Sequence, residues 1–514
     1  MLLQHSCRRL ATVRSSSIIT MPLRAKITHP AMQQQQQQQQ QPASRSFAST
    51  SDIKEQPDDE PNDVLFSSQG GVRSITLNRP KKLNSLNGSM ARKIIPRLQE
   101  WSRSEMANVV TIKGEGRAFC AGGDVAWLAQ RNKQGTAGQQ ESKDYFALEY
   151  KLDHLISTYS KPYVALIDGI TMGGGVGLSL HAPFRIATEN TVFAMPETNI
   201  GFFPDVGASF FLPRMDGELG KYCALTSEQI KGANVFYAGI ATHYLHSSSL
   251  PDLEARLAEL QFKDYDNLRR RFQSINSTIE EFATGLPHDQ PISAPVGGNI
   301  RAAIDYVFQP AHKIDDILQA LKGLSEMSSD QRGYPEVNEW AEKTRKTILQ
   351  RSPTSVKVSL EQLQRGREWS IGETFKREHA IASRFMEHPD FVEGVTALLV
   401  DKPKRTPKWS PESLDKVSKT DVNGFFEHET QFDLLSTDAG STGEDYKEYP
   451  HAWIGLPTEI EVQNTVRGYT REQIVEQFLK KTNGKQGVKE KVNEILDRKT
   501  RVDNPQTRRL AWQQ

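Results

Sequence analysis

The chain has 514 residues, of which 37% are hydrophobic and 25% are charged, and its net charge is +1. This balance offers no global attraction for nucleic acid, and no window approaches the roughly 18 consecutive apolar residues of a membrane helix. The three cysteines, Cys7, Cys120 and Cys223, are too few and too scattered for a disulfide framework or a zinc site. We therefore expect a soluble protein of a reducing compartment. Two domains plus appendages are expected because the length exceeds one ordinary core.

Residues 1–50 are basic and serine-rich, and no acidic residue precedes Asp52. This composition is typical of a mitochondrial transit peptide. The stretch Arg-Ser-Phe-Ala-Ser at 45–49 resembles a matrix-protease site, so residues 1–47 are assigned to a transit peptide and the protein to the mitochondrial matrix. A run of nine glutamines, 33–41, interrupts this segment as low-complexity sequence. The alternative is a basic tail without a targeting role.

Residues 48–63 are acidic and contain proline, which is typical of a linker. From residue 64, short apolar runs alternate with helical spacing. A helix is expected over residues 90–101, and strands are expected over residues 74–77, 109–112, 163–167, 184–187 and 192–194. This alternation predicts an α/β core, with strands buried between helices, over residues 64–310.

The strand pattern ends near residue 311, and residues 311–417 form a predicted helical region. Amphipathic helices are expected over residues 314–321, 356–369 and 373–386. The remaining residues, 418–514, are a polar and then basic extension. Within it, Thr470 to Gln473 has the form of a capping box, which predicts a helix. Its last part, 461–514, holds twelve Lys or Arg against seven Asp or Glu.

Two glycine-rich loops, 113–124 and 168–177, each follow a predicted strand. Glycine lets backbone N–H groups approach a ligand closely, and two such loops could direct two N–H groups at one developing oxyanion. The alternative is that these glycines only make tight turns and close packing. Neither loop has GxGxxG spacing, and the chain contains no GxxxxGK, GxSxG or HExxH motif.

Two carboxylates remain for activating water or attacking a substrate. Glu197 and Asp205 each directly follow a proline in the apolar stretch 194–210. A carboxylate in apolar surroundings is costly unless it is paired, hydrogen-bonded or functional. Taken alone, Glu197 also fits the start of a helix, Asp205 fits a turn, and Glu149 fits a solvated helix surface.

Several motifs in this order resemble the crotonase superfamily and, within it, the 3-hydroxyisobutyryl-CoA hydrolases. They are RAFCAGGD at 117–124, MGGGVGLS at 172–179, MPETNIGFFPDVG at 195–207, SPTSVKVS at 352–359, HPDFVEGVTA at 388–397 and PKWSP at 407–411. The resemblance covers residues 64–417. It implies a ββα spiral core followed by a helical C-terminal region.

The resemblance also bears on the reaction. Hydratases of the superfamily carry a glutamate two residues after the triple glycine, and this chain has Gly177 there. An isomerase could work with Glu197 alone. Asp205 stands where many relatives have a small residue, which favours thioester hydrolysis.

In the mechanism that the resemblance implies, the thioester oxygen lies between the N–H groups of Ala121 and Gly174. Glu197 attacks the carbonyl or activates water, Asp205 orients the substrate hydroxyl or the water, and Glu149 contacts the substrate. The substrate is 3-hydroxyisobutyryl-CoA, an intermediate of valine breakdown, and no metal or prosthetic cofactor is implied.

A reading of a different class is structural. Fungal relatives of this family are also components of the mitochondrial small ribosomal subunit, and the extension 418–514 resembles the fungal versions. Its basic part could contact ribosomal RNA or protein, or it could be solvated or folded back on the body. No membrane partner is expected, and crotonase relatives often form homo-oligomers.

Overall fold

The computed structural model describes residues 53–263, 266–287, 291–327, 334–427, 431–436, 444–504 and 506–513. These residues belong to one compact unit, Ser49–Gln514. The proposed transit peptide, 1–47, lies outside the described residues. Across the described ranges, no helix is both long enough and apolar enough to cross a membrane.

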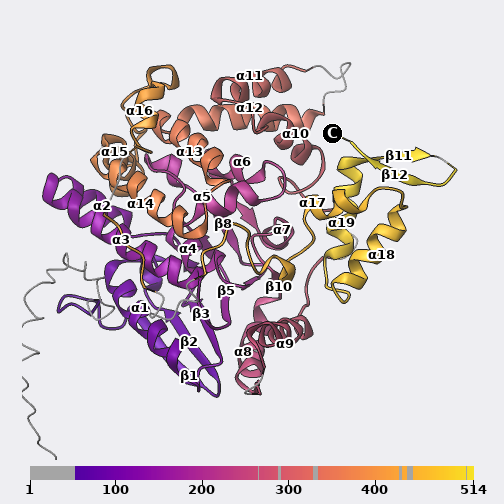
Figure 1. The fold of residues 1–514 in the computed structure, drawn as a ribbon. Coiled ribbons are helices and arrows are strands. Elements are labelled where there is room, and N and C mark those ends of the chain that lie inside the picture. Colours follow the sequence, from indigo (N-terminus) through magenta and orange to yellow (C-terminus); the bar gives the residue numbers. More distant parts are fainter. Residues whose placement is uncertain are drawn as a thin grey trace, which may run out of the picture. The chain divides into compact units, whose positions relative to one another are not determined.

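The larger sheet has six strands in the order β1-β2-β3-β5-β7-β10 (Figure 1). They are β1 (Val64–Gln69), β2 (Val72–Leu77), β3 (Val109–Gly114), β5 (Tyr163–Ile167), β7 (Phe184–Ala187) and β10 (His243–Tyr244). β1 pairs antiparallel with β2, and the other neighbours are parallel. All residues of β5 and β7 are buried; β5 reads as a continuous apolar run, whereas β7 includes the buried Arg185.

A second sheet has four strands in the order β4-β6-β8-β9. They are β4 (Ala118–Cys120), β6 (Ile170–Met172), β8 (Val192–Ala194) and β9 (Ile230–Lys231). The chain alternates between the sheets, since β3, β5 and β7 of the larger sheet are followed by β4, β6 and β8 of the smaller one. Helices follow each pair, so the resemblance-based expectation of a ββα spiral is confirmed.

The helices of the spiral begin with α1 (Gly88–Arg103), α2 (Val125–Asn132), α3 (Thr136–Ser157), α4 (Gly174–Leu180), α5 (Ala208–Phe211), α6 (Leu219–Thr226), α7 (Ala233–Tyr237), α8 (Leu250–Ala258) and α9 (Leu268–Glu281). α3 carries buried side chains along most of its last three turns. α4 is buried over its whole length and begins at Gly174, within the second glycine loop. These two helices position the site described below.

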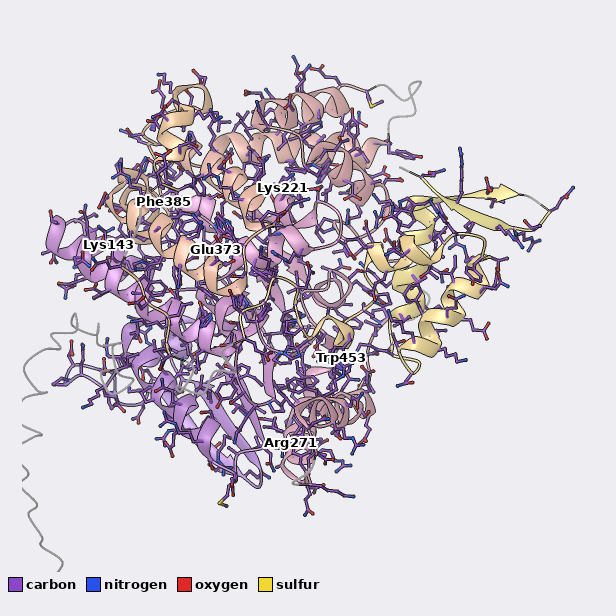
Figure 2. The ribbon with its side chains drawn as sticks, viewed as in Figure 1. Lys143, Lys221, Arg271, Glu373, Phe385 and Trp453 are labelled. Atoms are coloured by element: carbon purple, nitrogen blue, oxygen red, sulfur yellow. The ribbon has the colours of Figure 1, made fainter. Side chains whose placement is uncertain are left out.

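A helical region follows: α10 (Gly298–Val307), α11 (Ile314–Ser325), α12 (Pro335–Gln350), α13 (Pro353–Gly366), α14 (Ile371–Glu387) and α15 (Pro389–Val395). The three helices predicted over 314–321, 356–369 and 373–386 lie within or overlap α11, α13 and α14. α14 packs along α3. Lys143 of α3 and Phe385 of α14, labelled in Figure 2, come from this helix pair. The Lys143 ammonium lies 2.7 Å from the Glu387 carboxylate.

The extension is folded onto the body and ends in a two-stranded hairpin (Figure 1). Its elements are α16 (Lys419–Asn423), α17 (Glu459–Thr465), α18 (Arg471–Lys481), α19 (Val488–Lys499), β11 (Thr500–Asn504) and β12 (Arg509–Trp512). Thr470 caps α18 in the predicted capping box. Apolar side chains of α18 and α19, including Ile474, Phe478 and Ile495, are buried in the main core.

Many cations of this extension pair with acids of the body. Lys485 bonds Glu280, and Lys491 lies 2.8 Å from Asp216. Arg498 and Lys499 both contact Asp305, at 2.9 and 2.8 Å. Of the alternatives considered for the basic tail, these contacts match the one in which it folds back on the body.

The acidic segment before β1 also contacts the body. The Lys93 ammonium lies 2.6 Å from Asp63, and Arg79 lies 2.8 Å from Glu60. Asp63 is buried. The acidic composition of residues 53–63 therefore supplies partners for basic side chains of the first turn of the spiral.

Candidate active site

Glu197 and Asp205 follow the last parallel strand of the smaller sheet. Glu197 begins a short 3-10 helix (Glu197–Ile200), and Asp205 precedes a turn into α5. Both local readings, a helix start and a turn, are thus correct as geometry. Only 5% of Glu197 and 4% of Asp205 is exposed, so neither is an ordinary surface acid.

Burial dominates the electrostatics of these acids. It raises the pKa of Glu197 well above its ordinary value, and the nearby charges of Asp205 and Glu149 raise this pKa further. Burial also raises the pKa of Asp205 to about 7, although the Tyr150 hydroxyl donates a 2.7 Å hydrogen bond to Asp205 Oδ2 and opposes the shift. Glu197 Oε2 has no hydrogen-bond partner within the described residues. A buried carboxyl oxygen without a partner calls for a specific explanation, such as a proton or a bound group.

Glu149 lies on the inward face of α3, next to Tyr150. It is 2% exposed, so the reading of a solvated surface acid is wrong. A Cβ placed on Gly174 would lie 2.5 Å from Glu149 Oε1, and one placed on Gly173 would lie 3.1 Å from Glu197 Oε1. The second glycine loop therefore lies against both carboxyl groups, and a side chain at position 174 would collide with Glu149.

The first glycine loop meets the second at Gly123. A Cβ on Gly174 would lie 3.4 Å from the Gly123 nitrogen. Across the ranges that the structure describes, the N–H groups of Gly123 and Gly174 have no hydrogen-bond acceptor. The Ala121 N–H instead donates to the Leu83 carbonyl at 3.0 Å. Ala121 therefore does not fit the predicted oxyanion role, because its single amide hydrogen is already used.

The sequence matches the family model described as enoyl-CoA hydratase/isomerase over residues 72–426. The chain belongs to the enoyl-CoA hydratase/isomerase family. It is 52% identical over 502 residues to small ribosomal subunit protein mS47 of Neurospora crassa, covering 96% of this chain and 95% of that protein. It is 43% identical over 369 residues to mitochondrial 3-hydroxyisobutyryl-CoA hydrolase of Gallus gallus, covering 72% of this chain and 89% of that protein.

A solved structure is also similar. A carnitinyl-CoA dehydratase from Mycobacterium thermoresistibile aligns with a TM-score of 0.61 and 32% identity, covering 72% of this chain and 98% of that one. This likeness agrees with the two sheets and the helical region described above. The enoyl-CoA hydratase/isomerase fold thus accounts for the body, and the extension after residue 426 lies beyond the residues that the family model matches.

In this family member, two helices of the C-terminal region hold the loop that carries Asp205. Glu378 of α14 accepts hydrogen bonds from Gly207 N (2.7 Å), Ser209 N (2.9 Å) and Ser209 Oγ (2.6 Å). The Gln362 amide of α13 donates to the Pro204 carbonyl at 2.5 Å. These contacts fix the backbone on both sides of Asp205.

The end of α4 supports the same loop. The His181 ring lies 2.8 Å from the Val206 carbonyl through Nε2, and burial lowers the pKa of His181 to about 4. A neutral imidazole can donate this bond. Val206 itself has a φ of 55°, a strained conformation for a β-branched residue. The loop is held in place by its surroundings rather than by its own backbone preference.

The remaining residues of the first glycine loop have structural contacts. Cys120 is buried and its pKa is raised to about 12, mainly by burial, so the thiol stays protonated. The Asp124 carboxylate contacts Arg79 and Lys82 at 3.3 and 3.2 Å. Within the described residues, no group of three or more His, Cys, Asp or Glu side chains could hold a metal ion.

Sequence reasoning missed two buried acids beside the site, Asp153 and Glu378. Neither is exposed at all. Asp153 stands four residues after Glu149, so the helical period of α3 could have placed it on the same face. Glu378 reaches the site only because α14 packs against α3, which no local pattern records.

Proposed function

We propose that this protein hydrolyses the thioester of 3-hydroxyisobutyryl-CoA to 3-hydroxyisobutyrate and CoA, a step of valine breakdown. The observation that carries the proposal is the pair of buried acids Glu197 and Asp205 beside the two glycine loops. The 43% identity to a protein named as this hydrolase supports the choice of substrate.

In the proposed mechanism, the thioester oxygen accepts hydrogen bonds from the N–H groups of Gly123 and Gly174. Gly174 was expected from the sequence, and Gly123 replaces Ala121 because the Ala121 N–H is already bonded. Each such donor typically lowers the barrier by ~3 kcal/mol, because charge develops on the oxygen in the transition state.

Glu197 provides the reacting carboxylate. Its unpartnered Oε2 can attack the carbonyl carbon to form an anhydride, or it can take a proton from an attacking water. By the first route the C–S bond breaks as CoA thiolate leaves and takes up a proton, and water then hydrolyses the anhydride, which releases the acid and restores the Glu197 carboxyl group. By the second route water adds to the carbonyl carbon as Glu197 takes its proton, and the C–S bond breaks as CoA leaves with that proton. Asp205, oriented by Tyr150, accepts a hydrogen bond from the substrate 3-hydroxyl or the water, and Glu149 contacts the substrate beside Gly174.

Other reactions of the family fit the residues less well. Hydration of an enoyl-CoA needs a second carboxylate on α4, where this chain has Gly177. An isomerase needs only Glu197, but it gives no role to the second buried acid, Asp205. These differences favour hydrolysis.

The relatives' names support a mitochondrial location, and the basic, serine-rich segment 1–47 further supports transport to the matrix. The proposed small-molecule partner is an acyl-CoA. A homo-oligomer is a further proposal, which light scattering of the purified protein tests.

The test is thiol release from 3-hydroxyisobutyryl-CoA by the chain of residues 48–514. Glu197→Gln should reduce kcat by ~100- to 10,000-fold, the usual contribution of an acid–base group. Glu373→Gln is the matched control, because Glu373 lies in an exposed pair with Arg377. No release by the folded parent chain would refute the hydrolase proposal.

A second function is supported by a separate observation. The similarity to Neurospora crassa mS47 extends over 502 residues and so includes the extension, whereas the hydrolase similarity covers 369 residues. We propose that the protein is also a component of the mitochondrial small ribosomal subunit. Sedimentation of mitochondrial ribosomes tests this: the protein should travel with the small subunit, and recovery only in the soluble fractions would refute it.

A further inference from the structure

A third carboxyl group on α3 lacks the partners that a buried acid normally has. Asp153 is 0% exposed, and neither of its carboxyl oxygens has a hydrogen-bond partner within the ranges that the structure describes. Leaving a charged carboxylate in this state is costly, so a buried acid without a partner binds a proton or serves another group. The proposed hydrolysis gives Asp153 no role.

Asp153 fills the space over Gly177. A Cβ built on Gly177 would lie 2.5 Å from Asp153 Oδ2 and 2.7 Å from Oδ1. Real Cβ atoms do not approach oxygen so closely, and a fully buried carboxyl group has little room to move. The position at which a hydratase would carry its additional glutamate is therefore blocked by a carboxyl group from another helix.

The arrangement repeats along α3 and α4. Glu149 lies against Gly174, and Asp153, one turn later on α3, lies against Gly177, three residues later on α4. Burial raises the pKa of Asp153 well above its ordinary value, and the charges of Glu149, Asp205 and Glu378 raise it further. The other titratable groups that interact with Asp153 are Cys120 of β4, Tyr145 of α3 and Tyr163 of β5. None of these groups is a cation, so none of them favours the charged form of Asp153.

We propose that Asp153 is a positioning residue of the site: its carboxyl group closes the space that a side chain at position 177 would need and, one turn after Glu149 on α3, keeps Glu149 against Gly174 without adding a second negative charge beside it. The carboxyl group of Asp153, from α3, thus occupies the space next to position 177 of α4, where a hydratase carries its additional glutamate. The role of Asp153 in the reaction rests on the proposed hydrolase function, whereas its placement over Gly177 does not.

The first experiment tests the placement by thermal melting of four chains: the parent, Gly177→Ala, Asp153→Ala and the double variant. Gly177→Ala should lower the melting temperature of the parent by several degrees, because the new methyl group meets the carboxyl group. In the Asp153→Ala background the same change should cost much less. An equal loss in both backgrounds would overturn the placement. Gly323→Ala is the control, since a Cβ there meets no atom within 4 Å.

The second experiment tests the role by thiol release. Asp153→Asn keeps the shape and polarity of the side chain but cannot ionise, so it should retain kcat within ~3-fold, whereas Asp153→Leu should lose at least ~10-fold. In the parent, kcat/KM should decline at alkaline pH when Asp153 ionises and its charge repels Glu149. Asp153→Asn cannot ionise, so this decline should move to higher pH. Equal losses in the Asn and Leu variants, with an unmoved alkaline limb, would overturn the proposed role.

The two experiments separate the two proposals. If the folded parent releases no thiol, the hydrolase function fails, but the melting temperatures still report whether Asp153 occupies the space over Gly177. If the parent is active and Glu197→Gln is not, the hydrolase proposal stands. Loss of activity in Asp153→Asn as large as in Asp153→Leu would then refute only the positioning role.

Discussion

Arg498 of α19 and Asp305 of α10 lie 193 residues apart in sequence, and their Nη1 and Oδ2 atoms are 2.9 Å apart. The guanidinium group is 5% exposed and also contacts Glu459 and Glu494. Arg301 joins the same cluster through Asp305 and Glu459. Lys499 also pairs with Asp305, so a largely buried set of three cations and three acids joins the extension to the body.

Removing Arg498 should therefore be costly. Arg498→Met leaves buried acids with fewer counter-ions, and breaking a buried pair in this way costs roughly 3–5 kcal/mol. Urea unfolding should report a loss near the lower end of this range, because Asp305 keeps Arg301 and Lys499. The control is Lys481→Met, which breaks an exposed pair with Glu461 and should cost less than about 1 kcal/mol. Similar losses for both variants would contradict the buried network.

Gly174→Ala should damage the site without disturbing the fold at a distance. The added Cβ would lie 2.5 Å from Glu149 Oε1, so the carboxyl group must move away from the proposed oxyanion position. Misplacement of about 1 Å can cost about 100-fold, and kcat/KM for thiol release should fall by that order. Gly323→Ala, on the open surface of α11, should leave kcat/KM unchanged. An unaffected Gly174→Ala enzyme would rule out this close approach.

Asp205→Asn should stabilise the fold in a pH-dependent way. The pKa of Asp205 is about 7 in the folded state and 3.8 in its ordinary state, so ionisation of Asp205 lowers the free energy of unfolding. This loss begins as the pH rises above 3.8 and is complete above about pH 7. From about pH 5 to pH 8, the gain in unfolding free energy from the substitution should grow by roughly 2–3 kcal/mol. Denaturant unfolding at both pH values measures this. A gain that is the same at both would contradict the raised pKa.

Glu378→Gln should affect activity through the loop that carries Asp205. A glutamine offers one acceptor oxygen where three donors from Gly207 and Ser209 converge, and an unsatisfied buried donor costs ~1–3 kcal/mol. We expect kcat/KM for thiol release to fall by roughly 10- to 100-fold as Asp205 shifts. Glu373→Gln, on the exposed face of the same helix, is the control. If stability falls while the activity of the folded fraction is unchanged, the loop does not position Asp205 through Glu378.

The sequence allowed the buried part of the fold to be predicted most accurately. The strands expected over 163–167, 184–187 and 192–194 coincide with β5, β7 and β8. Buried strands read as apolar runs, which holds for β5 and β8 and, apart from Arg185, for β7. β4 and β6 were predicted only as parts of glycine loops. Each has three residues, which is too short for a periodic pattern to emerge.

The site was predictable in part, and the rest depended on contacts between distant segments. The motif around Glu197 and Asp205 identified both acids, and the structure places Glu149 beside them. Ala121 was expected as an oxyanion donor because the sequence does not record that its N–H is already bonded to the Leu83 carbonyl. Glu378 enters the site through the packing of α14 on α3, which a single sequence does not reveal.

The ion pairs between extension and body have a consequence for shorter members of the family. The family model ends at residue 426, yet Glu280, Asp216 and Asp305 find cations among Lys485, Lys491, Arg498 and Lys499. A chain that stops near residue 426 would lack these cations, so these acids would be more exposed or would have fewer cationic partners. Gain or loss of the extension during evolution should therefore coincide with charge changes at positions 216, 280 and 305, so that the two parts vary together across the family.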